Sequence, residues 1–373
     1  MWSDLPFDLL SNIFSFLSPD SLACAASACR QWHECAKTRR RPASNSYLSN
    51  WFVALPLRSH KKDNLSCYAQ NPTNKNWHFI FLNFLPSPIR PLTSIKSLIL
   101  FKTTNPTNLL NLLVCNPFTR EFKKLPILST PRSNPAIGVI PLGDDGGFQV
   151  YVAGGMSEAP RGGATYEPTM EVYDSRHDTW RVVGPLPTEF AVRLTVWTPN
   201  DSVFCDGVVY WITSARAYSL MGCDISSNSW LELRVPMAEK LEFAAAVRRK
   251  GRLAVVGGGG ACGGGAWVWE LGEGDSWVLV GKVPGELGVK FVGEMGRWAS
   301  TKCVGCDGGI YLYREVFGPG MIAWKEVGES GEWEWSWIEG CSFVGGEKVP
   351  QNLQMKGVLI PPNLAQSCFF LGK

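Results

Sequence analysis

The pattern of apolar and polar positions separates the start of the chain from the rest. Residues 7–17 contain few polar side chains, and at about 100° per residue their apolar positions cover roughly 180° of a helix. A helix that packs on the core of its own domain needs an apolar stripe of only about 100°, so this arc is wider than its own core requires. Ser18-Pro19-Asp20 is typical of a helix N-terminus and predicts a second helix through 22–29. A third helix carries Trp32 and Cys35.

A different pattern, a six-residue step, recurs along the rest of the chain. It joins an Asn or Asp to an aromatic residue at Asn71–Trp77, Asn116–Phe122, Asp174–Trp180 and Asp224–Trp230. The steps begin 45, 58 and 50 residues apart, and repetition at about this period predicts a propeller or another stacked array. Short β-rich runs such as 148–153, bounded by turn residues, indicate strands around each step.

The repeat weakens toward the C-terminus. Trp277 has no acid six residues before it, and the last unit, after Asp307-Gly308, has no clear closing proline. Six units best fit the spacing between Tyr47 and about Cys341. A strand at 356–360, within 343–373, is expected to close the ring, because closure removes exposed sheet edges. The predicted fold is therefore a small all-α domain of three helices at 1–42 and an all-β propeller of six blades at 43–373.

Composition is typical of a globular protein. With 373 residues, of which 45% are apolar and 18% charged, the chain is long enough for a sizeable core and more than one domain. Met1-Trp2-Ser3-Asp4 carries an acid instead of a basic n-region, and no apolar run approaches the roughly 18 residues of a spanning helix, so we expect neither secretion nor a membrane partner. Twelve scattered cysteines favour reduced thiols, in the nucleus or the cytoplasm.

Charge is distributed unevenly along the chain. Residues 43–135 hold 11 Lys or Arg and two acids, whereas residues 136–373 hold 20 bases and 27 acids, a net −7. The basic sector could steer an acidic partner, or the difference could be a chance mixture of solvated charges. No nucleic-acid partner is expected, because the pI is only 8.2 and no recognisable binding motif accompanies the basic residues.

The N-terminal segment resembles a known module. Leu5-Pro6-x-Asp8-Leu9-Leu10-x-x-Ile13-Phe14-Ser15-Phe16-Leu17-x-Pro19, followed by Leu22, Cys29 and Trp32, is similar to the F-box. In that family the module docks onto the Skp adaptor of a cullin-based ubiquitin ligase, the SCF complex. The resemblance implies that seven residues either contact the adaptor or form the module's core: Leu5, Pro6, Leu9, Ile13, Leu17, Leu22 and Trp32. Physics alone leaves open whether the surplus apolar arc meets a partner or the following domain.

The repeats resemble the kelch repeat. A strand, Gly154-Gly155, Tyr173-Asp174, the step to Trp180 and a closing Pro187 follow the kelch order. Asn116-Pro117-x-Thr119-Arg120 with Leu125-Pro126 is also similar to the degenerate repeats of plant F-box-associated domains.

The kelch resemblance also indicates where a partner would bind. Kelch-like rings place the loops between second and third strands, and those between blades, on one face; here these are roughly 156–168, 213–219, 259–266, 314–321, 187–195 and 285–298. Arginine and aromatic side chains dominate binding hot spots. The candidate substrate-binding residues are therefore Arg161, Arg193, Arg216, Tyr218, Arg297, Trp298, Arg314 and Phe317. The alternative is that several of these arginines pair with neighbouring carboxylates.

Enzymatic signals are weak. Gly258-x-Gly260-x-x-Gly263 matches a dinucleotide fingerprint, but no helix follows it, so we interpret it as a loop. Cys303 and Cys306 form a single Cys-x-x-Cys pair with no second pair and no histidine nearby, which is weak support for a metal site. The histidines at 33, 60, 78 and 177 are dispersed along the sequence. We expect no catalytic residue, no metal and no cofactor. The cluster of Lys37 and Arg39–Arg41 is either a nuclear localisation patch or a solvated helix end.

The leading hypothesis is a non-catalytic substrate receptor of an SCF-type ubiquitin ligase. The F-box would bind a Skp-type adaptor and, through it, a cullin, while the propeller would hold the protein to be ubiquitinated. One alternative is an F-box scaffold without ligase output. Another is a sensor or enzyme with a small-molecule ligand in the channel, but the readable inner-strand positions are apolar: Val150, Val152, Val208, Leu253 and Val255.

Overall fold

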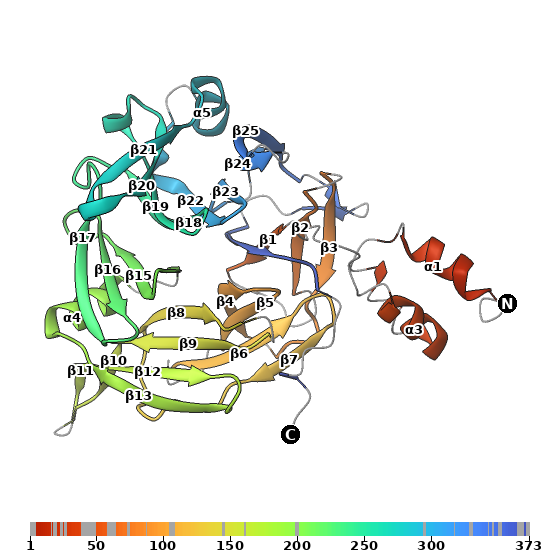
Figure 1. Ribbon diagram of the computed structural model, residues 1–373, viewed down its shortest axis with the longest axis horizontal. Helices are drawn as coiled ribbons and strands as arrows, with labels where there is room; N and C mark the ends of the chain where they lie inside the picture. Colours follow the sequence, from red (N-terminus) through yellow and green to blue (C-terminus); the bar gives the residue numbers. More distant parts are fainter. Residues whose placement is uncertain are drawn as a thin grey trace.

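The computed structural model shows a ring of β-sheets with a helical module beside it (Figure 1). It describes residues 5–15, 17, 21–22, 25, 28–38, 50–57, 65–72, 75–86, 88–103, 109–143, 146–159, 162–197, 201–293, 296–316, 318–327, 331–341, 343–344, 347–349, 353–363 and 369–370. All structural statements below concern these residues.

The helical module lies outside the ring, next to the blade that contains β1 to β3 (Figure 1). Its described helices are α1 (Phe7–Ser15) and α3 (Arg30–Thr38), and residues 21, 22, 25 and 28 between them are also helical. The two helices pack on a small core that contains Leu10, Phe14 and Cys35. The rest of the predicted second helix lies outside the described residues.

Six sheets of four antiparallel strands form the ring. With strands given from the first to the fourth, the first blade consists of β28 (Met355–Ile360), β1 (Trp51–Pro56), β2 (Ser66–Gln70) and β3 (Trp77–Phe81), and the second of β4 (Ile89–Ile95), β5 (Leu98–Thr103), β6 (Asn111–Asn116) and β7 (Glu121–Lys124). The third blade consists of β8 (Ala136–Pro141), β9 (Phe148–Ala153), β12 (Thr169–Asp174) and β13 (Thr179–Pro185), and the fourth of β14 (Ser202–Cys205), β15 (Val208–Thr213), β16 (Ser219–Asp224) and β17 (Ser229–Arg234). The fifth blade consists of β18 (Phe243–Arg249), β19 (Arg252–Gly258), β20 (Ala266–Leu271) and β21 (Trp277–Lys282), and the sixth of β22 (Thr301–Cys306), β23 (Gly309–Arg314), β24 (Gly320–Val327) and β25 (Glu332–Glu339). This arrangement confirms the predicted six-bladed propeller.

Shorter elements lie in the connections. Two small hairpins are β10 (Met156–Glu158) with β11 (Ala164–Tyr166), and β26 (Phe343–Val344) with β27 (Glu347–Lys348). The helices are α4 (Thr188–Trp197) and α5 (Gly285–Val292), with 3-10 turns η2 (Gly260–Cys262), η3 (Glu273–Asp275) and η4 (Trp298–Ser300). None of the described helices is long and apolar enough to cross a membrane.

The ring is closed by its last strand. β28 pairs with β1 over their full lengths, from Trp51 opposite Ile360 to Pro56 opposite Met355. The strands β28, β4, β8, β14, β18 and β22 contact one another in turn around the ring and are therefore innermost. The apolar residues that the sequence placed on inner strands, Val150 and Leu253 among them, lie instead on second strands such as β9 and β19. That assignment was wrong because the innermost strands carry weaker β signals.

Each pair of neighbouring blades shares one hydrophobic cluster. Val53 of the first blade and Ile99 of the second belong to one such cluster, and Val256 and Ile322 to the cluster between the fifth and sixth blades. The remaining four junctions have equivalent clusters. Most described cysteines contribute to these clusters as free, buried thiols, which is the usual environment of a non-reactive cysteine. The core is thus divided among the blade junctions.

The turn between the third and fourth strands explains the six-residue step. Asp224 ends β16, and its Oδ1 accepts hydrogen bonds from the amides of Ser226 at 2.8 Å and Ser227 at 3.0 Å. Asn116 and Asp174 accept an amide two residues ahead in the same way. Asn and Asp are favoured here because their side chains make this local turn. The aromatic residue then begins the outer strand.

A left-handed residue precedes the outer strand of every blade. It stands two positions before the aromatic residue, with φ between 53° and 69°, at Lys75, Arg120, Asp178, Asn228, Asp275 and Gly331. The fifth and sixth blades therefore keep the turn although their sequences lack the acid six residues before Trp277 and Trp333. The geometry repeats six times, whereas the side chains that signal it repeat four times.

Candidate functional site

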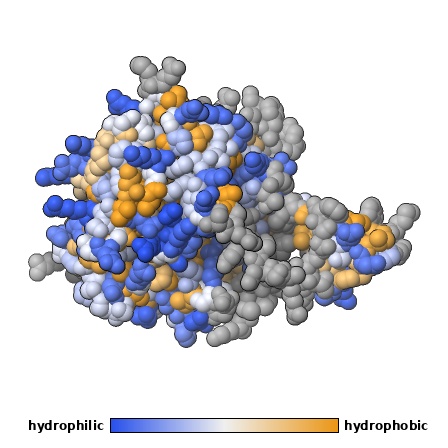
Figure 2. Space-filling model, turned by 45° about the horizontal axis from the view of Figure 1, so that its top comes forward, coloured by the Kyte–Doolittle hydropathy of each residue, from blue (hydrophilic) through white to orange (hydrophobic). Residues whose placement is uncertain are grey.

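Helix α1 has two apolar faces. Leu10 and Phe14 point into the module core and are 1% and 2% exposed. Phe7, Leu9 and Ile13 are 45%, 51% and 43% exposed. Figure 2 shows apolar, orange atoms on the surface of the part that projects away from the ring. In the described structure the surplus apolar arc is open to solvent and is not covered by the propeller.

The seven residues predicted for the F-box-like module divide between its core and its surface. Trp32 packs edge-on against Phe14, with ring centroids 5.4 Å apart, and Leu5, Leu17 and Leu22 also pack on the core. Pro6, Leu9 and Ile13 are exposed. Phe7 is also exposed on α1 but was not among the predicted contact residues. Its position in the apolar arc was the sequence feature that could have indicated it. Phe7, Leu9 and Ile13 are named the α1 apolar surface below.

The two ends of the propeller segment lie on one face of the ring. Trp51 begins β1 and pairs with Ile360, which ends β28. Because strand direction alternates within a blade, this face carries the turns between third and fourth strands, such as the turn after Asp224. The connections between second and third strands and those between blades lie on the opposite face, which is named the loop face below.

Four of the candidate substrate-binding residues support the loop face from within. Arg193, on α4, forms an ion pair with Glu232 at 2.9 Å. The Arg314 guanidinium donates to the carbonyl oxygens of Phe291 and Val292, both at 3.3 Å, at the end of α5. The Arg193–Glu232 pair matches the alternative that arginines of this face pair with neighbouring carboxylates, whereas the two Arg314 bonds go to main-chain carbonyl oxygens.

The aromatic candidates are likewise structural. Trp298 is 1% exposed, stacks on Phe243 at 5.8 Å and donates from Nε1 to the Gly264 carbonyl at 2.7 Å. Tyr218 is half-buried, and its hydroxyl donates to the Glu242 carbonyl oxygen at 3.3 Å. Among the candidates, Arg216 and Arg297 are exposed. Arg161 and Phe317 lie outside the described residues.

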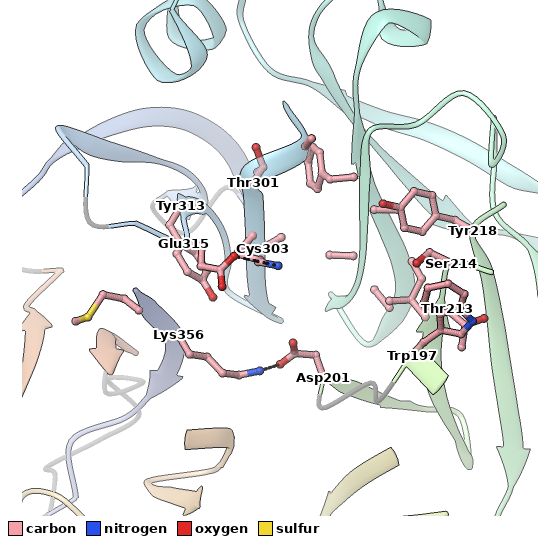
Figure 3. A pocket seen from close by; sticks show the side chains of 18 of the residues that line it. Trp197, Asp201, Thr213, Ser214, Tyr218, Thr301, Cys303, Tyr313, Glu315 and Lys356 are labelled. Carbon is pink, nitrogen blue, oxygen red and sulfur yellow. Dashed lines mark hydrogen bonds and ion pairs between the residues drawn. The ribbon is translucent and has the colours of Figure 1, made fainter. Parts of the chain in front are cut away.

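A pocket of about 400 Å³ opens between the innermost strands. Figure 3 shows two ion pairs in it: Lys356 on β28 with Asp201 at 2.7 Å, and Lys302 on β22 with Glu315 at 3.7 Å. The expectation of an apolar channel was therefore wrong, because charged residues of the innermost strands were not recognised as such. The Thr301 hydroxyl, also in the pocket wall, is buried without a hydrogen-bond partner in the described structure.

Two further polar groups of the pocket wall, Cys303 and Tyr313, are not poised for acid or base chemistry. Burial raises the pKa of the Cys303 thiol well above its usual range, so the thiol stays protonated at neutral pH. Burial also raises the pKa of Tyr313, whose hydroxyl oxygen accepts a hydrogen bond from the Gly357 amide at 2.9 Å. Both groups are fixed parts of the wall.

The remaining enzyme-like motifs have structural roles. Gly258 ends β19, and Gly260 and Gly263 lie in and after the short turn η2, so the glycine run forms a connection on the loop face. Cys306 accepts a hydrogen bond from Asn50 at 3.1 Å. No group of three His, Cys, Asp or Glu residues in the described part of the chain could hold a metal ion.

Family comparisons agree with this architecture. The F-box-like family model matches residues 2–41, and the kelch motif model matches residues 149–187, which contain β9, β12 and β13. The chain combines an F-box with a kelch-type propeller.

The chain has similar proteins in Arabidopsis thaliana, including two that carry F-box in their names. The chain is similar to Protein UNUSUAL FLORAL ORGANS, with 23% identity over 92% of this chain and 80% of the relative. F-box only protein 6 is 23% identical over 93% of this chain and 72% of its own length. An F-box/kelch-repeat protein is 26% identical over 76% of this chain and 73% of its own length. The similarity to the first two of these relatives covers more than nine-tenths of this chain and so extends beyond the propeller segment.

Proposed function

We propose that this protein is the substrate-receptor subunit of an SCF-type ubiquitin ligase. The F-box binds a Skp-type adaptor and, through it, a cullin, and the propeller holds the protein to be ubiquitinated. The α1 apolar surface carries this proposal, because three large apolar side chains on a module of roughly forty residues are typical of a surface that a partner covers.

The proposed contribution to ubiquitin transfer is proximity. The receptor supplies no acid, base or nucleophile. It raises the effective concentration of the substrate near a conjugating enzyme that carries ubiquitin. The separation of the F-box from the loop face supports this division of labour. Such a complex works in the nucleus or the cytoplasm, where cysteines such as the buried Cys67 and Cys115 stay reduced.

Co-purification with the adaptor tests the proposal. The chain is co-expressed with a tagged Skp-type adaptor, and its recovery is compared between wild type and Leu9→Asp/Ile13→Asp. Both positions are about half exposed, so the double variant should keep its fold and lose the adaptor. Ile127→Asp is the matched control, because Ile127 is 76% exposed and lies on the propeller. A wild-type chain that does not recover the adaptor would contradict the proposal.

A second measurement distinguishes the receptor from a scaffold that binds the adaptor without leading to ubiquitination. A receptor brings the cullin down with the adaptor, and proteins captured by its propeller acquire ubiquitin in a reconstituted reaction. A scaffold captures the same proteins without their ubiquitination.

The central pocket favours one further candidate function, a sensor of a small polar ligand. Its volume of about 400 Å³, two ion pairs and the unpartnered Thr301 hydroxyl suit a compact molecule with both donor and acceptor groups. A thermal-shift screen of polar metabolites tests it, with Lys356→Met as the matched variant. A ligand of this pocket should raise the Tm of the wild type and not that of the variant.

A further inference from the structure

A second depression lies on the loop face, at the rim of the fourth blade. Its open volume is about 720 Å³, and its walls are the connection between β15 and β16 and the connection between β17 and β18. Its charged side chains are Arg193, Arg216, Glu232, Arg234, Glu239 and Lys240, and Met237 also lines it. Tyr218 lines both this depression, named the fourth-blade groove, and the central pocket.

The groove is preformed by hydrogen bonds between its walls. The Tyr218 amide on one connection donates to the Ala238 carbonyl on the other at 3.3 Å. Two tight turns then shape the second wall, in which the amides of Ala238 and Lys240 donate to the carbonyls of Val235 and Met237. A preformed groove loses little conformational entropy when a ligand binds.

The free charge of the groove is positive. Arg193 at its base is neutralised by Glu232 and also donates to Thr213 at 3.2 Å and to Ser219. Arg216, Arg234 and Lys240 are exposed and form no ion pair with any described residue, and Glu239 is the one remaining carboxylate in the lining.

This charge is opposite in sign to the net charge of residues 136–373, the stretch of chain that contains the groove. Residues 136–373 have 27 acids and 20 bases, so three unpaired cations in one groove are not a reflection of the average surface. A long polyanion such as DNA would meet the acidic remainder of these blades, whereas a short acidic segment would fit within the groove.

Apolar side chains lie among the cations. Met237 is 38% exposed and is held at φ 53°, and Val235 and Tyr218 also line the groove. Positive φ is a strained backbone conformation for a non-glycine residue, and such strained residues are common at binding sites. The methionine thioether adapts to the shape of an apolar partner.

We propose that the fourth-blade groove binds a short acidic peptide segment of the protein to be ubiquitinated. Carboxylates of the segment pair with Arg216, Arg234 and Lys240, and one apolar side chain packs against Met237. Guanidinium groups suit this role because they bind carboxylates through two parallel hydrogen bonds. The assignment rests on the proposed receptor function and names its substrate class.

Fluorescence anisotropy with defined probes tests the groove. The full chain, purified with its adaptor, is titrated against a fluorescein-labelled decapeptide of Asp and Glu with one central Leu, in about 0.15 M salt. The comparison probe has the same sequence with Asn and Gln. We expect the acidic probe to bind at least tenfold more tightly. Equal binding of the two probes would overturn the proposal.

Charge reversal locates the binding surface. Arg216→Glu/Arg234→Glu/Lys240→Glu should weaken binding of the acidic probe at least tenfold. The matched control, Lys124→Glu/Arg181→Glu/Lys282→Glu, makes the same change in net charge with exposed cations of the outer strands β7, β13 and β21. Equal losses in both variants would show long-range attraction and overturn the assignment. So would a DNA duplex that binds the groove as tightly as the peptide.

A third variant isolates the apolar contact. Met237→Ser should weaken binding of the Leu-containing probe and have little effect on a probe with Ser in that place. Adaptor recovery is measured in every variant. If adaptor recovery is intact and the acidic probe does not bind, the groove assignment fails alone; if the wild type does not recover the adaptor, the receptor function fails.

Discussion

The indole Nε1 of Trp180 donates a hydrogen bond to the carbonyl oxygen of Pro126 at 2.8 Å. Trp180 begins the outer strand of the third blade, and Pro126 lies just after the last strand of the second. Trp277 reaches the carbonyl of Arg234 at 2.8 Å in the same way, between the fifth and fourth blades. Through these bonds Trp180 and Trp277 each join their own blade to the preceding one.

Removing this bond should weaken the junction between the second and third blades. Trp180→Phe keeps the ring that packs on Tyr173, with centroids 5.4 Å apart, and loses the donor. We expect the free energy of unfolding to fall by about 1 kcal/mol, the usual contribution of one hydrogen bond. Denaturation by urea measures it.

A matched substitution separates the bond from the change of ring. In the described structure the Nε1 of Trp230, at the equivalent position of the fourth blade, has no hydrogen-bond partner. Trp230→Phe should therefore leave stability unchanged or raise it slightly, since a buried donor without a partner is itself unfavourable. Equal losses in the two variants would show that ring size, and not the bond, is what matters.

The repeated turn shows what could be read from the sequence. Asp174, Asp224 and Asn116 are recognisable because an Asx turn requires their side chains. The left-handed residue two positions before the aromatic residue is Lys, Arg, Asp, Asn or Gly, so no residue type marks it. The six-residue step thus marks four of the six blades, and the other two repeat the backbone geometry without the side chain that signals it.

Lys75 is a turn residue whose backbone conformation is unfavourable for a residue with a Cβ. It has φ 60°, where a residue with a Cβ is strained by about 1 kcal/mol. Lys75→Gly should therefore raise the free energy of unfolding by about 0.5 to 1 kcal/mol, because glycine adopts this region freely. Thermal and urea unfolding measure the change.

The control for Lys75 keeps the strain and removes the charge. Lys75→Gln retains a Cβ at positive φ, so it should not reproduce the gain. If it stabilises the protein as much as glycine does, the gain comes from relief of charge repulsion with Lys325, whose lowered pKa reflects burial first and the nearby Lys75 second.

The candidate site was less predictable than the fold. The loop face was placed correctly by strand order, but Trp298 and Arg193 were chosen by residue type, and their roles depend on contacts with Phe243 and Glu232 in neighbouring connections. Met237, which lies in the fourth-blade groove, was not chosen because it stands in a connection that carries no motif. Such contacts join residues far apart in sequence, so local patterns do not contain them.

Asp224 should make stability depend on pH in the acid range. Hydrogen bonds from the Ser226 hydroxyl and from the amides of Ser227 and Ser226 lower the pKa of Asp224 to about 2. A carboxyl whose pKa is lower in the folded state stabilises the fold fully above its unfolded pKa, near 3.8, and this contribution is lost as the pH falls toward 2.

The comparison is between wild type and Asp224→Asn, which keeps an Asx turn and cannot ionise. The stability advantage of the wild type at pH 5 should shrink at pH 4 and again at pH 3, as measured by thermal unfolding. Ser226→Ala removes the strongest of the hydrogen bonds and should give an intermediate dependence. An advantage that stays constant from pH 5 to pH 3 would contradict the lowered pKa.

Gly258 and Gly260 distinguish the structural role of the glycine run from a dinucleotide fingerprint. A Cβ on Gly258 would lie 2.6 Å from Cε1 of Phe243 and 3.0 Å from the Ala266 Cβ, whereas a Cβ on Gly260 would meet no atom within 4 Å. Gly258→Ala should therefore lower the free energy of unfolding by about 1 to 3 kcal/mol through overpacking. Gly260→Ala should change it by less than about 0.5 kcal/mol.

The same pair reports on the loop face. Phe243 stacks on Trp298, whose Nε1 bonds to the Gly264 carbonyl, so a shift of Phe243 should also change the fluorescence of the buried Trp298. We expect that change in Gly258→Ala and not in Gly260→Ala. A run that bound a pyrophosphate would instead be sensitive at both glycines, because each allows close approach of the backbone. Equal effects at the two positions would therefore argue against the scaffold role that Phe243 and Trp298 indicate.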